Sequence, residues 1–354
     1  MKRIEKSGEV VPTPSGLFKI AIVGAASLKG KEIKDLLTER NFPATDIRLL
    51  DDEESMGQVD SVGDEPTFIQ SVLPDQFIGV DFTFFASEAP FTANSWHMAQ
   101  TASSEIIDLS YALESQPNAQ LRAPWIDREL GRDFSKQLAS VPVVLAHPAA
   151  VSLALIFLRL KKVGTIHHAA ATILEPASEH GRKGMDELHD QTVNLLSFQQ
   201  MPMTTFGTQI AFNIVPEYGE GVQPTVATIQ DRIGRHFRAM VSDQATVPSV
   251  MLVQAPVFHG YAFSIYIELD SPMSVGHIES ALAGDHIQVL RAEETPSNLN
   301  VAGATDVQVS VRPDTQHPNG FWIWAAADNL RIMATQAVEC AEQMVSTRPR
   351  GKVQ

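Results

Sequence analysis

Residues 143–158, VVLAHPAAVSLALIFL, form the kind of junction at which α/β enzymes often place a reactive side chain. An apolar run typical of a buried strand is followed by a proline turn and then by a helix-forming run. A nucleophile at this point would have its pKa lowered by the N-terminus of the helix. The junction carries Ala149 and Ala150 instead, and neither methyl group can act as a nucleophile.

Nearby polar side chains could take over part of this chemistry. Ser152 lies in the expected first turn of the helix, where a serine more often bonds the backbone than attacks a substrate. His147 and His259 could supply an acid–base pair, although single histidines beside turns usually have structural roles. Tyr261 could act as an acid if its pKa were lowered. Cys340, the only cysteine, belongs to an apolar helical stripe and is predicted to be buried. The sequence has no zinc-ligand spacing, so no metal is predicted.

A second candidate site is the loop VGAASLKG at 23–30, which follows an apolar strand pattern and opens a helix. Gly24 would allow a tight turn and Gly30 a close packing of helix on strand, while Ser27 replaces the middle glycine of a dinucleotide-binding loop. Backbone N–H groups at the start of the helix would still face a phosphate. The pattern is equally consistent with a strand–helix turn that binds no nucleotide.

Four consecutive carboxylates, residues 51–54, follow the second strand pattern. An acid at Asp51 would bond the ribose hydroxyls of NAD, and the acidic run would repel the 2′-phosphate of NADP. If a dinucleotide binds, NAD is therefore favoured over NADP. The alternative is a solvated acidic turn and no cofactor. The predicted cofactor-binding residues come from the loop and from two strand ends: Gly24, Ala26, Ser27, Leu28, Gly30, Asp51 and Ser87.

The elements that would position these residues alternate regularly in the first part of the chain. Helical patterns separate five apolar strand patterns, at 18–23, 46–50, 81–87, 104–110 and 141–146. This alternation predicts an α/β fold with a Rossmann-type, doubly wound parallel sheet. From about residue 150, many strands with intervening helices predict an α+β domain with a mixed, largely antiparallel sheet. Residues 247–258 and 261–269 are predicted to form a strand pair within it.

Composition limits the class of protein. The length of 354 residues favours two domains, and a single cysteine excludes an internal disulfide framework and suits a reducing cytoplasm. A net charge of −15 without a clustered basic face argues against nucleic-acid binding. No apolar run approaches the roughly 20 residues that a membrane span needs. Residues 1–16 are polar and are expected to form an N-terminal extension rather than a secretory signal.

Several segments resemble the aspartate-semialdehyde dehydrogenase family over nearly the whole chain. The most specific are IAIVGAASLKGKEI at 20–33, KGMDEL at 183–188, QIAFNIVP at 209–216 and ADNLR at 327–331. The resemblance implies a nucleotide-binding domain at 17–149 that the C-terminal helix at 328–346 completes. It also implies a dimerisation or substrate domain at 150–327, whose sheet builds a homodimer.

The chemistry of that family needs a cysteine that attacks the aldehyde, a histidine that moves the proton, a glutamine that holds the acyl intermediate and an arginine that grips the substrate carboxylate. The resemblance aligns these four positions, in that order, with Ala150, Tyr261, Glu175 and Gln254. A further arginine position, which serves an anionic group, aligns with Glu114. Every polar role is therefore replaced together, and an alanine methyl cannot form a thiohemiacetal.

Three functions are compatible with these substitutions. The favoured one is a non-catalytic relative, most like the family's USG-type members, that acts as a binding or structural partner. It would form a homodimer or associate with an active paralogue. The second is an oxidoreductase that uses NAD(P) on an aldehyde or oxo group without a covalent thioester. The third is a nucleotide or metabolite sensor. The sequence leaves the identity of any small-molecule ligand open.

Overall fold

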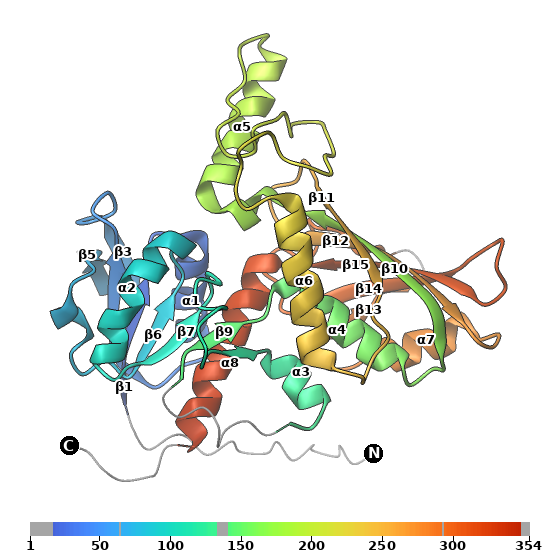
Figure 1. The fold of residues 1–354 in the computed structure, drawn as a ribbon, viewed down its shortest axis with the longest axis horizontal. Helices are drawn as coiled ribbons and strands as arrows, with labels where there is room; N and C mark the ends of the chain where they lie inside the picture. The colour runs from blue at the N-terminus through green and yellow to red at the C-terminus, as the bar shows by residue number, and fades with distance from the viewer. Residues whose placement is uncertain (1–16, 64, 133–140, 292–293, 348–354) are drawn as a thin grey trace, which may run out of the picture.

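The computed structural model describes residues 17–63, 65–132, 141–291 and 294–347. The predicted extension at 1–16 lies outside the described residues. The chain folds around two sheets that lie side by side, with the last helix, α8 (Asn329–Thr347), between them (Figure 1). None of the described helices is long and apolar enough to cross a membrane.

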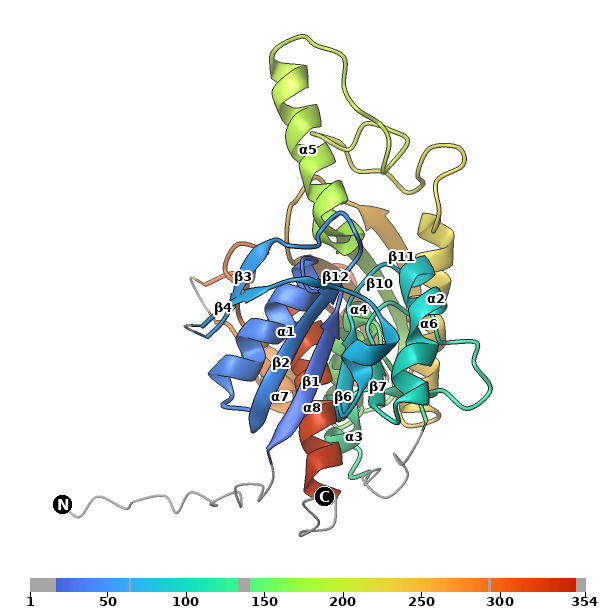
Figure 2. The same ribbon diagram turned by 90° about the vertical axis from the view of Figure 1, so that its left-hand side faces the viewer.

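The first sheet is parallel throughout, with the strand order β5-β2-β1-β6-β7-β9-β8. Its strands are β1 (Phe18–Val23), β2 (Ala44–Asp51), β5 (Gln70–Ser71), β6 (Phe82–Phe85), β7 (Glu105–Asp108), β8 (Gln120–Arg122) and β9 (Val143–Leu145). Helices α1 (Leu28–Glu39) and α8 pack on one face, while α2 (Ala89–Thr101) and the 3-10 turn η1 (Pro74–Phe77) pack on the other (Figure 2). The predicted doubly wound sheet is confirmed. A small antiparallel pair, β3 (Val59–Val62) and β4 (Glu65–Phe68), and helix α3 (Pro124–Glu129) complete this part of the chain.

The local sequence explains why the first helix starts where it does. The last four residues of β1 are buried apolar side chains, as a parallel strand covered by helices on both faces requires. Ser27 then caps α1, because its Oγ accepts the N–H of Gly30 at 2.9 Å. The glycine loop is thereby held at the carboxyl ends of the parallel strands.

The second sheet is mixed, with the strand order β11-β10-β12-β15-β14-β13. Its strands are β10 (Ile166–Glu175), β11 (Ser249–Gln254), β12 (Tyr261–Leu269), β13 (Ile287–Val289), β14 (Val307–Pro313) and β15 (Gly320–Ala327). Helices α4 (Pro148–Leu160), α6 (Val226–Val241) and α7 (Val275–Leu282) share one core with it. Successive residues of β12 alternate between buried and half-buried, so the other face of the sheet is only half covered. Three of its five pairings are antiparallel, which confirms the predicted largely antiparallel α+β arrangement.

The predicted strand pair at 247–258 and 261–269 is wrong in one respect. β11 and β12 are not neighbours, because β10 lies between them and pairs with both. The connecting segment runs beside the turn η2 (Ala177–His180), where Val257 and Phe258 accept the N–H groups of Ala177 and Ser178. A chain held in this way cannot fold back as a hairpin.

Helix α5 (Gly181–Leu196) projects beyond both sheets, and the chain returns from its tip through a long segment to α6 (Figures 1 and 2). The base of this arm meets the carboxyl end of β10, where η2 leads into α5. Tyr218 of the returning segment therefore comes close to the carboxyl ends of β10 and β11.

Candidate functional site

The junction at the start of α4 holds no reactive side chain. Ala149 and Ala150 are fully buried in the core that α4 shares with the second sheet. His147 caps the helix, because its Nδ1 accepts the N–H of Ala149 at 3.3 Å. Ser152 donates its hydroxyl proton to the carbonyl of Pro148 at 2.9 Å, which is a backbone role rather than that of a nucleophile.

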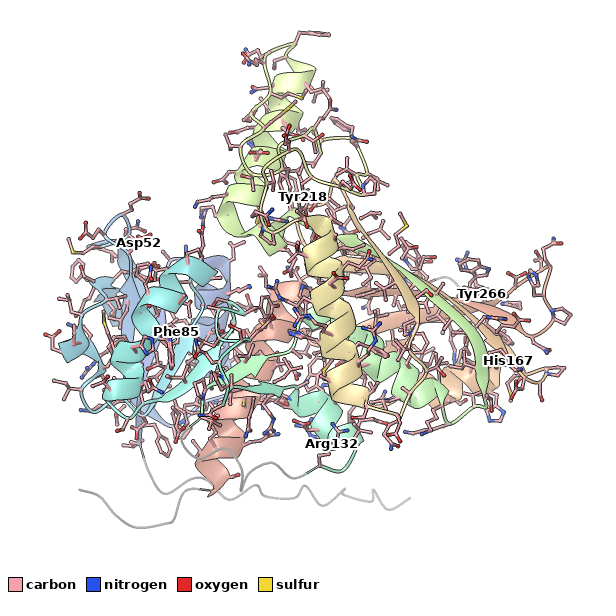
Figure 3. All side chains as sticks on the ribbon, in the orientation of Figure 1. Asp52, Phe85, Arg132, His167, Tyr218 and Tyr266 are labelled. Carbon is pink, nitrogen blue, oxygen red and sulfur yellow. The ribbon has the colours of Figure 1, made fainter. Side chains whose placement is uncertain are left out.

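Glu175 and Gln254 lie at the carboxyl ends of the adjacent parallel strands β10 and β11. Tyr218, which no local sequence pattern indicated, joins them. The hydroxyl of Tyr218 lies 3.0 Å from Oε2 of Glu175, 3.1 Å from Oε1 of Gln254 and 2.7 Å from Nε2 of His180. Figure 3 shows Tyr218 at the base of the α5 arm. Gln254 donates its Nε2 protons to the carbonyls of Glu175 and Ala255, which turns its Oε1 toward Tyr218.

The protons in this cluster can be counted. One hydroxyl proton of Tyr218 cannot serve three acceptors, and Oε1 of Gln254 can only accept. All four groups are satisfied when Tyr218 donates to Gln254 and accepts from a protonated Glu175 and from Nε2–H of His180. Burial and the nearby charge of Glu179 raise the pKa of Glu175 to about 8, and burial lowers the pKa of His180 to about 4. Both shifts agree with a neutral network at pH 7.

Tyr261 is fully buried at the start of β12, beside the same cluster. Its hydroxyl makes no well-formed hydrogen bond within the described chain, although Glu179 lies close enough to raise its pKa. Burial, Glu179 and Glu175 together hold that pKa well above the ordinary value. The acid role suggested for Tyr261 requires the opposite shift, so the structure does not favour it.

His147 does not contact His259 in the described structure, and the suggested acid–base pair is not formed. The His147 ring stacks on Tyr111 with centroids 5.6 Å apart, and its backbone N–H donates to Nδ1 of His236 at 2.9 Å. Burial, His236 and Arg232 lower its pKa well below the ordinary value. His147 is therefore a neutral capping and packing residue.

Glu114 anchors an ion cluster between the two parts of the molecule. Its carboxylate accepts from Nε of Arg232 at 2.7 Å, from Nη2 of Arg235 at 3.2 Å and from Nε2 of His236 at 3.0 Å, all on α6. Burial works against ionisation here, but the bond from His236 and the charge of Arg232 lower the pKa of Glu114 to about 2. An internal carboxylate therefore binds the cations of α6.

The glycine loop is compact and partly satisfied by its own neighbours. Gly24 has a φ of +84°, and a Cβ there would lie 2.4 Å from the backbone nitrogen of Ser87. The Ala26 N–H donates to Oδ2 of Asp51 at 2.7 Å, so the carboxylate predicted to bind ribose also bonds the loop. Ser27 donates to the carbonyl of Ala86, in addition to capping α1.

A nucleotide phosphate still fits this loop in one place. The first N–H groups of a helix have no partner within the helix. Gly30 is satisfied by Ser27, which leaves the N–H groups of Leu28 and Lys29 for a phosphate. Ser87 shares a hydrogen bond of 2.8 Å with Thr92 and faces α2. In the described parts of the chain, no three histidine, cysteine or acidic side chains are grouped to hold a metal ion.

Two family models match the chain. The semialdehyde dehydrogenase NAD-binding domain matches residues 19–146, and the semialdehyde dehydrogenase dimerisation domain matches residues 158–332. The chain belongs to the semialdehyde dehydrogenase family. The predicted family resemblance is thus confirmed, and the junction with Ala149 and Ala150 lies between the two matched regions.

Relatives in this family are similar to the chain over nearly their full length. It is 28% identical to the aspartate-semialdehyde dehydrogenase of Rickettsia bellii, with 93% of this chain and 98% of the relative covered. It is also 28% identical to a USG-1 protein homolog of Azotobacter vinelandii, with coverage of 94% and 98%. The solved structure of a probable aspartate-semialdehyde dehydrogenase from Pseudomonas aeruginosa is 26% identical, covers 93% of this chain and 99% of its own, and superposes with a TM-score of 0.82.

Cys340 lies away from this semialdehyde dehydrogenase-family site. It is buried on α8 in the core that α8 and α1 share with the first sheet. Burial raises the pKa of its thiol to about 12. The structure agrees with the predicted buried role.

Proposed function

We propose that this chain is a non-catalytic member of the semialdehyde dehydrogenase family that acts by binding. The observation that carries the proposal is the environment of Ala150, which is fully enclosed on the first turn of α4. This is the position that the resemblance assigns to the nucleophilic cysteine. The only thiol in the chain, Cys340, is protonated at neutral pH and packs in another core. No side chain is therefore available to form a thioester at this junction.

The other three family positions support the same proposal. The Tyr218 hydroxyl links the side chains of Glu175 and Gln254, and Gln254 also donates to the backbone carbonyl of Glu175. Tyr261 is enclosed beside them. A buried carboxylic acid and a fixed amide oxygen offer no positive charge to a substrate carboxylate. We infer that the position of the substrate-gripping arginine has become part of an internal hydrogen-bond network.

The nucleotide-binding domain is assigned a binding role only. A dinucleotide, NAD rather than NADP because of the acidic residues 51–54, would place a phosphate at the N–H groups of Leu28 and Lys29. When bound it would supply hydride-transfer chemistry, and the residues of this chain would hold and orient it. The alternative is that the chain acts by binding without any dinucleotide, and a test for dinucleotide binding distinguishes the two.

The partner in this proposal is a second copy of the chain. The dimerisation-domain match and the half-covered face of the second sheet support it. Tyr266, labelled in Figure 3, lies on that sheet. Its ring packs against that of Trp322 with centroids 5.1 Å apart, and 45% of Trp322 is exposed. An active paralogue could pair through the same face, which co-purification of two tagged chains would reveal.

The decisive test is an activity assay with aspartate semialdehyde, phosphate and either NAD or NADP. The wild type and Ala150→Cys should both be inactive, because the single thiol lacks the arginine, histidine and glutamine that its chemistry needs. Turnover at the rate of working relatives by the wild type would refute the proposal. Turnover by Ala150→Cys alone would show that the remaining pocket is still functional. Light scattering on the same samples should give the mass of a dimer.

A second function, direct hydride transfer to an oxo group, is favoured by one observation. Glu175, Tyr218 and His180 form a buried chain that could pass a proton to a substrate oxygen. Oxidation of NADH in the presence of a panel of oxo acids, lost in Tyr218→Phe, would support this function over the binding role.

A further inference from the structure

Two cationic side chains lie over one aromatic ring at the carboxyl ends of the parallel strands. The Nζ of Lys29 is 5.4 Å from the centroid of the Tyr111 ring, and the guanidinium carbon of Arg232 is 4.6 Å from it. Lys29 comes from the glycine loop and Arg232 from α6, so the pair brings together the two parts of the molecule. The charge of Arg232 helps to lower the pKa of Lys29, to which burial contributes most.

Both cations have hydrogen-bond donors to spare. Lys29 uses one of three, in a bond of 3.1 Å to the carbonyl of Leu109. Arg232 bonds Glu114 through Nε, and its terminal nitrogens have no hydrogen-bond partner in the described residues. The hydroxyls of Tyr111 and Tyr261 are likewise buried without a well-formed bond in the described structure. Tyr261 is fully enclosed, and Tyr111 is close enough to contribute to its raised pKa.

The nearby carboxylates are engaged elsewhere. Glu114 accepts from the guanidinium groups of Arg232 and Arg235 and from the imidazole N–H of His236, all on α6. Glu179 raises the pKa of Lys29 from a distance, but its Oε1 accepts from Nδ2 of Asn329 at 2.9 Å. Asp108 accepts from the N–H and hydroxyl of Ser110 and from the N–H of Leu113. No carboxylate of the described residues lies within ion-pair distance of Lys29, so its charge lacks a direct partner.

Lys29 lies beside the edge of the sheet at which ligands of this fold class bind. The strand order runs from β1 outward in both directions, to β2 on one side and to β6 and β7 on the other. Ligands of open α/β sheets bind at the carboxyl ends of the strands on either side of such a switch point. The Lys29 side chain lies at this end of the sheet, since it reaches the residue that follows β7.

We propose that the switch point binds a compact oxyanion, the carboxylate or phosphate of a small metabolite, through Lys29 and Arg232. This proposal rests on the binding role proposed above and adds the chemical class of the ligand. The anion relieves the repulsion between the two cations and takes up their free donors. In this proposal the anion is bound by side chains of the glycine loop and α6, and not by a residue at the position of Gln254.

Isothermal titration of the full chain at pH 7 and low salt tests this site, with inorganic phosphate, succinate, AMP and NAD as separate probes. Lys29→Gln and Arg232→Gln remove one cation each. Lys31→Gln and Arg238→Gln are the matched controls, on α1 and α6 respectively, outside the Tyr111 cluster. At least one probe should bind with a Kd of about 1 mM or tighter. Binding should weaken about tenfold or more in Lys29→Gln and Arg232→Gln, the ratio expected for one lost charge-assisted hydrogen bond, and should be unchanged in the controls.

The four probes separate the sources of the anion. Binding of succinate alone indicates a carboxylate metabolite, whereas binding of phosphate and AMP indicates a phosphate ester. Equal binding of every probe by the wild type and Lys29→Gln, or no binding of any probe, overturns the proposed site. Arg232→Gln also removes a hydrogen bond to Glu114, so the unfolding midpoint of this variant is measured as well. If Arg232→Gln proves to be unfolded, the result for Lys29→Gln alone decides the test. Dehydrogenase turnover by the same samples is a separate result that would refute the proposed non-catalytic role, whatever the titrations show.

Discussion

Replacing Glu175 by glutamine should make the protein less sensitive to alkaline pH. The pKa of this buried carboxyl is raised from 4.5 to about 8, so the folded state keeps a proton that the unfolded state releases. Stability therefore falls as the pH rises from 4.5 to 8, by about 1.4 kcal/mol for each pH unit and by about 5 kcal/mol in total. Glu175→Gln removes this dependence, because the amide is neutral throughout and can still donate to Tyr218. The variant gains on the wild type across that range.

Urea unfolding at pH 5, 6, 7 and 8, followed by tryptophan fluorescence, measures the difference between the two proteins. Glu220→Gln is the matched control, since Glu220 is exposed on the same returning segment as Tyr218. Infrared spectroscopy provides an independent reading, because a protonated carboxyl band present at pH 7 should be absent from Glu175→Gln. A difference that stays constant with pH, together with no such band, would mean that Glu175 is ionised. The proton count in the Tyr218 cluster would then be wrong.

Three further predictions concern the ion cluster, the glycine loop and the thiol. Glu114→Gln should cost about 2 kcal/mol at pH 7, and this cost should decline as the pH falls from 4.5 through about 2, where Glu114 itself becomes protonated; unfolding at pH 3 should show it reduced by about half relative to pH 7. Gly24→Ala should lose about 2–4 kcal/mol, because a Cβ would lie 2.4 Å from Ser87, whereas Gly57→Ala, with a similar φ of +80° and open space, should lose about 1 kcal/mol by thermal unfolding. Cys340 should resist a thiol reagent in the native protein and react only in denaturant, and rapid native labelling would contradict its burial.

The architecture could be predicted from the sequence because strand, helix and turn signals are local patterns. Alternating strand and helix signals defined the parallel sheet, and a proline turn between an apolar strand and a helix located the start of α4. The partners of β11 could not be predicted in this way. Its neighbour β10 lies more than 70 residues earlier in the chain, and the segment before β12 is held by η2 rather than by a turn.

The sequence predicted which positions form the candidate site, but it did not predict the contacts between their side chains. The sequence indicated Ala150, Glu175, Gln254 and Tyr261 together. It did not indicate Tyr218, which joins two of them from the segment that returns from the α5 arm to α6. Lys29 lies inside the predicted phosphate loop, yet the direction of its side chain toward Leu109 depends on the position of β7. Arg232 was an unremarked residue of a predicted helix, and only the packing of α6 against Tyr111 reveals it. Long-range contacts of this kind have no local sequence signal.

The residues at the aligned family positions Glu175 and Gln254 are coupled through Tyr218. An arginine in place of Gln254 would face Tyr218 and a carboxyl whose neutral state depends on the absence of a nearby cation. Such a charge would lower the pKa of Glu175, ionise it and rearrange the protons of the cluster. A glutamine in place of Glu175 tolerates that cation, whereas the glutamate does not without ionising. Restoring the arginine alone should therefore produce a salt bridge with Glu175 rather than a free carboxylate-binding site. Recovery of substrate binding requires both positions to change together, and a double-mutant cycle on Glu175→Gln and Gln254→Arg should be strongly non-additive.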